Sequence, residues 1–239
     1  MPHIEYYAKL KIHNGKMDKV KHAMDGINAA AKALGAQMLR SDWYLNEAKH
    51  EAATVTVYND EAALHVHCQQ AGEHFAALAA CSDGSLQFFD TPPAQIPATL
   101  AAFNPAKFQF AYGIKSSPTP IHSTKRGIEI YSLFSIFPGK LNEFKAVGAE
   151  LLPIIRSKDP GTTRYDWFYD DANLKCVALD CYADTPSMFA HMKNAHDVHE
   201  LLYNCSTMLT EFLGELPDDA KAAVARYDPN VLPLCAALS

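Results

Sequence analysis

Residues 40–47 read RSDWYLNE and residues 164–171 read RYDWFYDD, and the two stretches lie 124 positions apart. The same offset aligns residues 4–110 with residues 128–234 without a gap, and about 23 of the 107 aligned positions are identical. Two copies of this length are too few and too long for a solenoid, whose repeats run to about 20–50 residues. The alignment therefore predicts a duplicated small domain, a dimer fused into one polypeptide.

The composition and net charge of the chain are those of a globular protein and argue against nucleic-acid binding and membrane spans. The chain has 239 residues, 49% hydrophobic and 20% charged, with a net charge of −6, which is ordinary for a globular chain with a full core. The negative charge argues against nucleic acid as a partner, because phosphate binding needs clustered Lys and Arg. The sequence shows no signal peptide and no apolar stretch long enough for a membrane span, and its six cysteines contain no CxxC pair. We therefore expect a cytoplasmic protein with reduced thiols and no membrane partner.

Each copy contains the same order of predicted elements. Apolar periodicity and turn residues predict a strand, a helix, two strands that form a hairpin, a second helix and a last strand. In the first copy these are residues 3–12, 17–34, 40–45, 52–58, 60–80 and 84–90, and in the second copy residues 127–136, 141–157, 164–169, 175–182, 184–206 and 208–214. Asp60 and Asp184 stand where they can cap the second helix. The order β-α-β-β-α-β is that of a ferredoxin-like unit.

The predicted fold class is α+β, with two tandem ferredoxin-like units. Such a unit has helices on only one face of its sheet, so the bare face has to be buried against something. We expect the two units to pack sheet to sheet as an intramolecular α/β barrel. The predicted boundaries are residues 1–111 for the first unit, 112–126 for a Ser-, Pro- and Thr-rich linker, and 127–239 for the second unit.

Several stretches resemble the antibiotic biosynthesis monooxygenase-like family of the dimeric α/β-barrel superfamily. They are residues 166–171 (DWFYDD), residues 181–184 (CYAD) and the helix at 188–199. Both copies have a strand that ends in Tyr-x-Asp, followed by a His nine residues after the Tyr, at Tyr58 and His67 and at Tyr182 and His191. The resemblance implies the barrel fold. It is less specific for chemistry, because the superfamily includes quinol-type monooxygenases, haem-degrading enzymes, isomerases and dehydratases.

The haem-degrading branch is disfavoured. Its members carry a Trp on the second helix and, ten residues later, a His that binds iron. Here His67 and His191 stand at the Trp position, and the residues ten positions later are Ala77 and Leu201. We expect no haem and no other cofactor.

Two recurring histidines are the leading catalytic candidates. His67 and His191 are equivalent in the two copies, and an imidazole near its pKa can move a proton to or from a phenol, quinol or enol. The alternative is a packing residue that both copies inherited. His196 and His199 share a helix face, but their counterparts Gly72 and Phe75 cannot bind a metal, so we predict no metal site.

Aromatic residues and a glutamate complete the candidate site. Trp167 and Tyr131 are the further catalytic candidates, and the substrate-binding candidates are Trp43, Tyr7, Glu129, Tyr165 and Phe189. A Trp on the barrel face gives a flat wall for an aromatic substrate, whereas on the helix face it is ordinary core. A buried glutamate would have a raised pKa and could serve as a base. Arg40 with Asp42, and Arg164 with Asp166, are expected to form structural ion pairs. The second unit is richer in aromatic residues and is the preferred site.

The sequence thus predicts a cofactor-independent monooxygenase-like enzyme acting on a small phenolic, quinol or polyketide-like aromatic, with dioxygen as co-substrate. Two alternatives stay open: an isomerase or dehydratase that uses the same histidine, and a non-catalytic small-molecule binding protein. The fused pseudo-dimer is expected to be a monomer or to form a homodimer.

Overall fold

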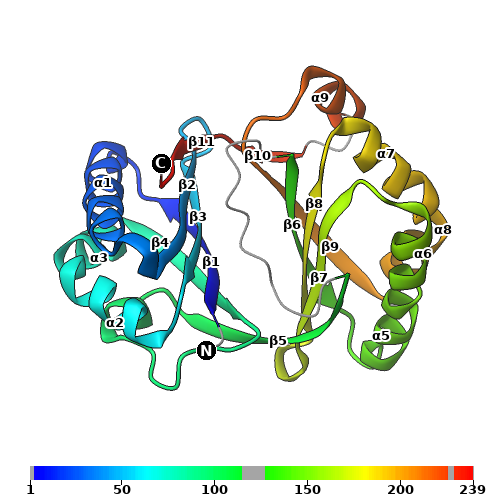
Figure 1. The fold of residues 1–239 in the computed structure, drawn as a ribbon, viewed down its shortest axis with the longest axis horizontal. Coiled ribbons are helices and arrows are strands. Elements are labelled where there is room, and N and C mark those ends of the chain that lie inside the picture. The colour runs from blue at the N-terminus through cyan, green and yellow to red at the C-terminus, as the bar shows by residue number, and fades with distance from the viewer. Residues whose placement is uncertain (1–2, 115–126, 226–228, 239) are drawn as a thin grey trace. The chain divides into compact units, whose positions relative to one another are not determined.

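The computed structural model describes residues 3–114, 127–225 and 229–238 (Figure 1). The chain divides into two compact units, residues 1–107 with 232–239, and residues 108–231. In the first half the elements are β1 (Ile4–Ile12), α1 (Met17–Ala33), a 3₁₀ turn (Gly35–Gln37), β2 (Met38–Asn46), β3 (Glu51–Tyr58), α2 (Glu61–Gln70), α3 (Gly72–Ala79), β4 (Ser82–Phe89), α4 (Ala98–Ala101) and β5 (Pro105–Gly113). In the second half they are β6 (Ile128–Ile136), α5 (Leu141–Ala149), α6 (Leu151–Lys158), β7 (Thr162–Asp170), a 3₁₀ turn (Asp171–Asn173), β8 (Lys175–Tyr182), α7 (Thr185–Asn194), α8 (His196–Tyr203), β9 (Ser206–Leu213), α9 (Asp218–Val224), β10 (Asn230–Leu232) and β11 (Leu234–Ala236).

Both units have the predicted β-α-β-β-α-β order, so the α+β ferredoxin-like prediction is confirmed. The strand order is β4-β1-β3-β2-β11 in the first unit and β10-β9-β6-β8-β7-β5 in the second. Within each unit the first strand of the repeat lies inside the sheet, because β1 pairs with both β3 and β4, and β6 with both β8 and β9. Among the described residues, no helix is long and apolar enough to cross a lipid bilayer.

Each sheet is completed by a strand from the other half of the sequence. β5 pairs with β7, where Phe110 lies opposite Phe168 and Tyr112 opposite Trp167. β11 pairs with β2, where Leu234 lies opposite Tyr44 and Ala236 opposite Trp43. These pairs are related by the 124-residue offset, so the two exchanges are equivalent. The predicted boundaries at 111 and 127 follow the sequence repeats. The compact units differ from the repeats at their ends, because residues 108–111 belong to the second unit and residues 232–239 to the first. Residues 115–126 of the predicted linker lie outside the described residues.

The two Tyr-x-Asp motifs start the second helices. Asp60 accepts a hydrogen bond from the backbone N–H of Ala63 at 2.9 Å, and Asp184 accepts one from the N–H of Ser187 at 2.9 Å. The predicted caps are therefore confirmed, and they satisfy backbone donors that a helix start leaves free. The predicted single helices at 60–80 and 184–206 are wrong in one respect, because each is divided into two, at Ala71 and at Ala195.

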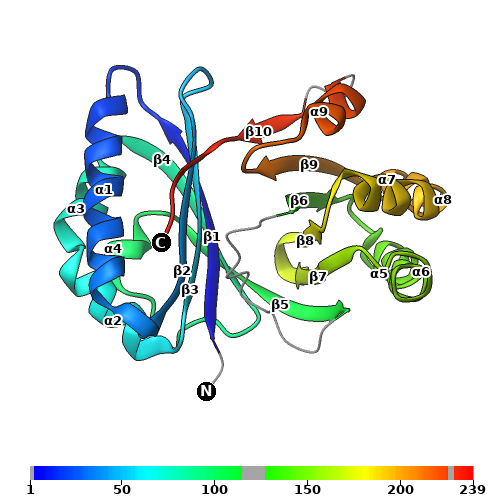
Figure 2. The same ribbon diagram turned by 45° about the horizontal axis from the view of Figure 1, so that its top comes forward.

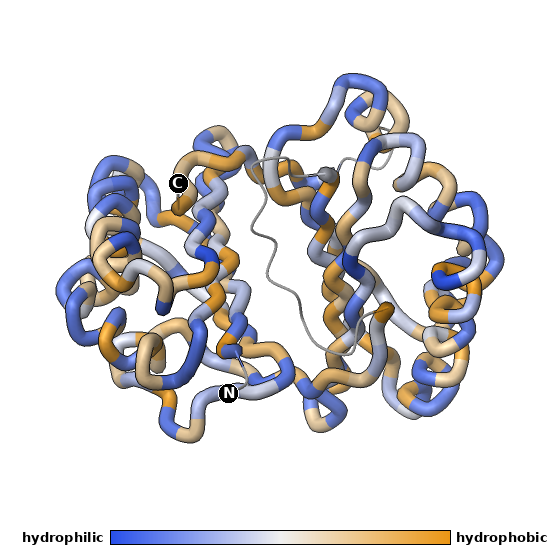
Figure 3. The backbone as a smooth tube through the Cα atoms, viewed as in Figure 1, coloured by the Kyte–Doolittle hydropathy of each residue, from blue (hydrophilic) through white to orange (hydrophobic). Residues whose placement is uncertain are grey.

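The helices of each unit cover one face of its sheet, as Figure 2 shows for α1 and α3 in the first unit. On this face of β1 the alternate residues from Ile4 to Ile12 enter the main core, together with Trp43 of β2. The corresponding core of the second unit contains Phe134, Tyr165 and Trp167. Figure 3 shows the hydrophobic residues following the strands in both units. The alternation of residues along each strand therefore decides which candidates lie under the helices.

The other face of each sheet carries the predicted ion pairs. Nε of Arg164 lies 2.8 Å from Oδ2 of Asp166, and Arg40 forms the equivalent contact with Asp42. All four side chains are buried, so the prediction of structural ion pairs is confirmed. A buried pair is costly to break, because either charge alone would be left without compensation.

The strand exchange predicts a selective effect of C-terminal truncation. A chain that ends at Val231 lacks β11 and with it the carbonyl of Pro233, which accepts a hydrogen bond from the N–H of Leu45 at 2.8 Å. We expect faster amide hydrogen exchange in β2, because its edge becomes exposed, and unchanged exchange in β7, which keeps β5. Equal acceleration in β2 and β7, or none in β2, would contradict this account.

Candidate functional site

His191 lies in the last turn of α7, against the helix-covered face of the second sheet. Its Nδ1 is 2.9 Å from Oδ2 of Asp159, the residue that follows α6. The imidazole ring lies 5.5 Å from the ring of Tyr165 and 5.4 Å from the ring of Tyr182, measured between centroids. Both His191 and Asp159 are 3% exposed. A carboxylate can only accept, so Nδ1 carries the proton and Nε2 keeps its lone pair.

The surroundings keep this imidazole neutral. Burial lowers the pKa of His191, and the hydrogen bond and charge of Asp159 only partly oppose that effect. A neutral ring with a free lone pair on Nε2 can accept a proton. His199 of α8 stands edge-on to His191 at 5.4 Å, and burial, followed by the nearby charges of His191 and His196, lowers its pKa to about 4.

His67, the equivalent residue in the first unit, has both ring nitrogens occupied. Nε2 lies 2.9 Å from the carbonyl oxygen of Ile27, and Nδ1 lies 2.7 Å from the hydroxyl of Tyr58. Because a carbonyl cannot donate, Nε2 must carry the proton, and Nδ1 accepts the hydroxyl proton of Tyr58. His67 is completely buried. This geometry is that of a structural histidine, with the opposite tautomer from His191.

Trp167 and Trp43 are core residues under the helices. Trp167 is 1% exposed and stacks on Tyr112 and Phe134, with ring centroids 5.5 and 5.4 Å away. Tyr165 lies 6.0 Å from Trp167 and thereby connects it to His191. The indole N–H of Trp43 has no hydrogen-bond partner among the residues that the structure describes.

The remaining candidates are not part of this cluster. On β8, Leu179 lies opposite Tyr131 of β6, and the preceding residue, Ala178, lies opposite Trp167 of β7. Consecutive side chains of a strand point to opposite faces, so Tyr131 and Trp167 lie on opposite faces of the sheet. Glu129 lies on the face of Tyr131, two residues earlier on β6. Tyr7 pairs with Val55 and Trp43 with Thr54, so they too are on opposite faces. Phe189 packs against a separate cluster beside α9. The expectation that Tyr131, Trp167 and His191 line one site is therefore wrong.

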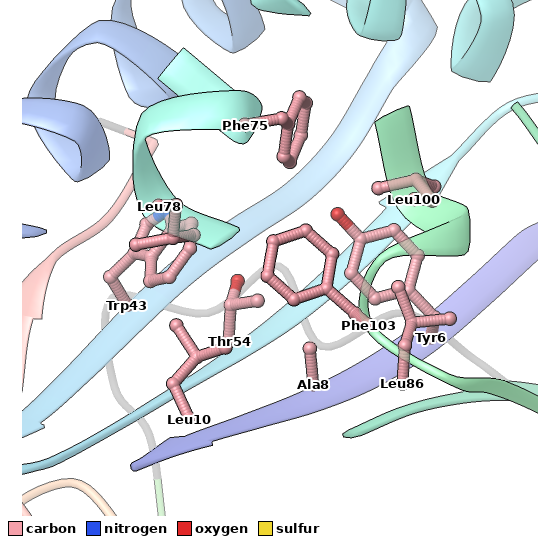
Figure 4. Close-up of a pocket in the computed structure, with 10 residues that line it drawn as sticks. All are labelled: Tyr6, Ala8, Leu10, Trp43, Thr54, Phe75, Leu78, Leu86, Leu100 and Phe103. Atoms are coloured by element: carbon pink, nitrogen blue, oxygen red, sulfur yellow. The ribbon is translucent and has the colours of Figure 1, made fainter. Parts of the chain in front are cut away.

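A small cavity lies in the first unit, between the sheet and helices α3 and α4 (Figure 4). Its volume is about 10 Å³, which is room for one water-sized molecule. The lining residues point toward one another and are Tyr6, Ala8, Leu10, Trp43, Thr54, Phe75, Leu78, Leu86, Leu100 and Phe103. Trp43 is the only predicted site residue among them. The cavity is too small for an aromatic substrate in this conformation.

Sequence reasoning missed Asp180, which lies on β8 under the helices of the second unit. It pairs with Tyr165 of β7 and is 9% exposed, and its Oδ1 has no hydrogen-bond partner within the described ranges. Burial, reinforced by the charge of Asp166 and opposed by Arg164, raises the pKa of Asp180 to about 8. The repeat gives a signal that could have identified it, because the equivalent residue in the first unit is the neutral Thr56.

Asp159 was also missed, and its counterpart is Gly35. The second unit thus holds two acidic groups, Asp159 and Asp180, and a neutral histidine where the first unit has neutral residues and a fully bonded histidine. Within the described parts of the chain, no group of three or more His, Cys, Asp or Glu side chains is placed to hold a metal ion.

Comparisons with known proteins show the fold. No family model matches the sequence, and no curated protein matches it. A proposed monooxygenase from Fusobacterium nucleatum aligns with a TM-score of 0.58 and 14% identity, over 87% of this chain and 90% of its own. A proposed monooxygenase from Lactobacillus acidophilus aligns with a TM-score of 0.54 and 9% identity, over 88% and 92%. An anthrone oxidase-like protein aligns with a TM-score of 0.51 and 9% identity, over 88% and 90%. The resemblance to the antibiotic biosynthesis monooxygenase-like proteins is confirmed at the level of fold.

A buried carboxyl without a partner should reduce stability, so we expect Asp180→Thr to stabilise the protein. Since folding raises the pKa of Asp180 from 3.8 to about 8, the unfolded chain loses this proton first and stability falls as the pH rises toward 8. The variant should therefore unfold with a free energy higher by about 1–3 kcal/mol at pH 8, and the gain should shrink toward pH 5. Urea denaturation at both pH values measures it. The reverse change at the equivalent position, Thr56→Asp, should destabilise, and a less stable Asp180→Thr would refute the assignment.

The lowered pKa of His199 predicts a loss of stability in acid. Its folded pKa is about 4, whereas an unfolded histidine has a pKa of about 6.5, so its contribution is complete above pH 6.5 and is lost as the pH falls toward 4. His199→Phe introduces the residue of the equivalent position, Phe75, which meets His67 edge-on at 5.7 Å. Between pH 7 and pH 5, we expect the free energy of unfolding of the variant to fall by about 1 kcal/mol less than that of the wild type. Identical losses in urea denaturation would show that His199 is not desolvated.

Proposed function

We propose that the chain is a small-molecule enzyme, a cofactor-independent monooxygenase that acts on a phenolic, quinol or polyketide-like aromatic. The observation that carries the proposal is the His191–Asp159 pair, with Nδ1 and Oδ2 2.9 Å apart, buried among aromatic rings in the second unit. The pair holds a neutral imidazole in one tautomer and leaves Nε2 to accept a proton. The shared fold with an anthrone oxidase-like protein supports an aromatic substrate class.

The chemistry follows from what an electron-rich aromatic can do without a cofactor. His191 takes the acidic proton of the substrate, and Asp159 stabilises the imidazolium that forms. The resulting anion is electron-rich enough to reduce dioxygen itself, so the protein supplies the base, the orientation and a dry surrounding. Tyr165 and Tyr182, whose ring centroids lie 5.5 and 5.4 Å from that of His191, are the rings against which an aromatic substrate would be held.

The roles of the other candidates change with the geometry. Tyr165 stays a proposed substrate-binding residue. Trp167 packs against Tyr165 and is proposed to hold the Tyr165 ring in position. His67 and Trp43 are proposed to be structural. Tyr7, Glu129 and Tyr131 lie on the other face of their sheets, and Phe189 lies beside another cluster, so the proposal gives them no part in proton transfer.

The test is oxygen consumption with a panel of simple quinols, recorded with an oxygen electrode and repeated under anaerobic conditions. We expect uptake that depends on the quinol, and a decrease in kcat of about 100-fold in His191→Asn, because general-base catalysis is lost. His65→Ala is the matched control, since His65 is an exposed histidine on the equivalent helix α2, where its ring lies 3.5 Å from the carboxylate of Glu61.

Three outcomes would contradict the proposal. Turnover without oxygen uptake would favour an isomerase or dehydratase. Binding without any turnover would favour a non-catalytic binding protein. Full activity in His191→Asn would remove the proposed proton acceptor.

A further inference from the structure

Asp180 occupies a position that the proposed proton transfer to His191 does not use. It lies on β8 between Tyr165 of β7 and Ile130 of β6, its Cα partners in the two neighbouring strands. Residues opposite each other share a face, so Asp180 and Tyr165 both lie under the helices. The carboxyl is about nine-tenths buried, and no described residue offers its Oδ1 a hydrogen bond. Buried polar atoms rarely lack a partner, which points to one from outside the protein.

Asp180 and His191 share two aromatic neighbours. The ring centroids of Tyr165 and Tyr182 lie 5.5 and 5.4 Å from that of His191. The charge of Asp180 acts on the hydroxyls of the same two tyrosines and raises the pKa of each, in addition to the larger effect of burial. The acid and the imidazole therefore both interact with the same pair of tyrosines within one unit.

The groups around Asp180 keep it protonated at neutral pH. Arg164 is the nearby cation that would favour the ionised form, but its Nε is held by Asp166 at 2.8 Å. The titratable and charged groups that interact with Asp180 are Arg164, Tyr165 and Asp166 on β7, and Cys176 and Tyr182 on β8. From the helix layer, Asp159 acts on Tyr182, and His191 is bonded to Asp159 and lies near both tyrosines. Burial is the largest effect and raises the pKa of Asp180 to about 8. A carboxylic acid that stays neutral can donate a proton.

We propose that Asp180 is the proton donor of the second unit and forms, with His191, an acid–base pair that acts on one aromatic ligand. This inference rests on the proposed function and specifies its substrate as an aromatic with an acidic CH₂ group. The environment lowers the pKa of His191 and raises the pKa of Asp180. This is the pattern expected when one group acts as a base and the other as an acid.

The reaction balances with dioxygen as the oxidant. His191 takes one proton from an activated R₂CH₂, the carbanion adds dioxygen, and the imidazolium returns its proton to give the hydroperoxide R₂CH–OOH. His191 then takes the remaining C–H proton, and the electron pair of that bond forms the C=O bond as the O–O bond breaks. Asp180 gives its proton to the departing hydroxide, so the products are R₂C=O and water. Proton transfer from His191 to Asp180 restores both groups.

The pH dependence of kcat for oxidation of anthrone, which has the activated CH₂ of this reaction, tests the assignment. Since only protonated Asp180 can donate, kcat of the wild type should fall as the pH rises above about 8. We expect Asp180→Asn and Asp180→Thr to lower kcat by about 100-fold at pH 7 and to lose the alkaline decrease. Thr56→Ser, at the equivalent position of the first unit, should leave the profile unchanged. Wild-type rates with an unchanged alkaline decrease in both Asp180 variants would overturn the proposal.

A measurement that needs no turnover separates this inference from the proposed function. Infrared difference spectra of wild type and Asp180→Asn at pH 7 should contain a carboxylic acid C=O band that titrates with a midpoint of about 8. Binding of 4-nitrophenol as a probe should shift that band. Absence of the band at pH 7, or a band that the probe leaves unchanged, would refute the role of Asp180. A shifted band in a protein that consumes no oxygen with any quinol would refute the monooxygenase while supporting Asp180 as the ligand-facing acid.

Discussion

The register of the β7–β8 hairpin fixes the positions of the residues that matter most in this molecule. It sets Tyr165 opposite Asp180 and Trp167 opposite Ala178, with all four under the helices. Arg164 and Asp166, the residues before and after Tyr165, lie on the other face, where they pair with each other. A slip of one residue would exchange the two sets, placing the ion pair in the helix-covered core and the aromatic rings outside it. The buried ion pair and the buried rings therefore hold the register together.

Because the two units are copies of one domain, each residue of the second unit can be compared with the equivalent residue of the first. At equivalent positions, Tyr165 replaces Ser41, Asp180 replaces Thr56 and His199 replaces Phe75. In the first unit His67 bonds to Tyr58 and to the carbonyl of Ile27. In the second unit the same helix position holds a histidine bonded to an acid. The two units thus share one fold, but the histidine of the first unit is bonded to neutral groups and that of the second unit to an ionisable one.

Much of the architecture could be predicted from the sequence, because the signals are local. The alternation in residues 164–170 and the caps at Asp60 and Asp184 depend only on neighbouring residues, and both are confirmed. The grouping of Tyr131 with Trp167 was wrong because the relative faces of two strands depend on how they pair, which alternation within one strand does not specify. The exchange of β5 and β11 is likewise a long-range pairing. Asp180 could have been noticed as a charge at a position that alternation assigns to the core.

The central claim is that the two equivalent histidines have diverged in their chemistry, and their tautomers test it most directly. Nitrogen NMR of the uniformly ¹⁵N-labelled protein at pH 7, assigned with the variants His67→Asn and His191→Asn, distinguishes a proton on Nδ1 from one on Nε2. The geometry predicts two neutral rings, with the proton of His67 on Nε2 and that of His191 on Nδ1. The same tautomer at both positions, or a doubly protonated His191, would contradict the account.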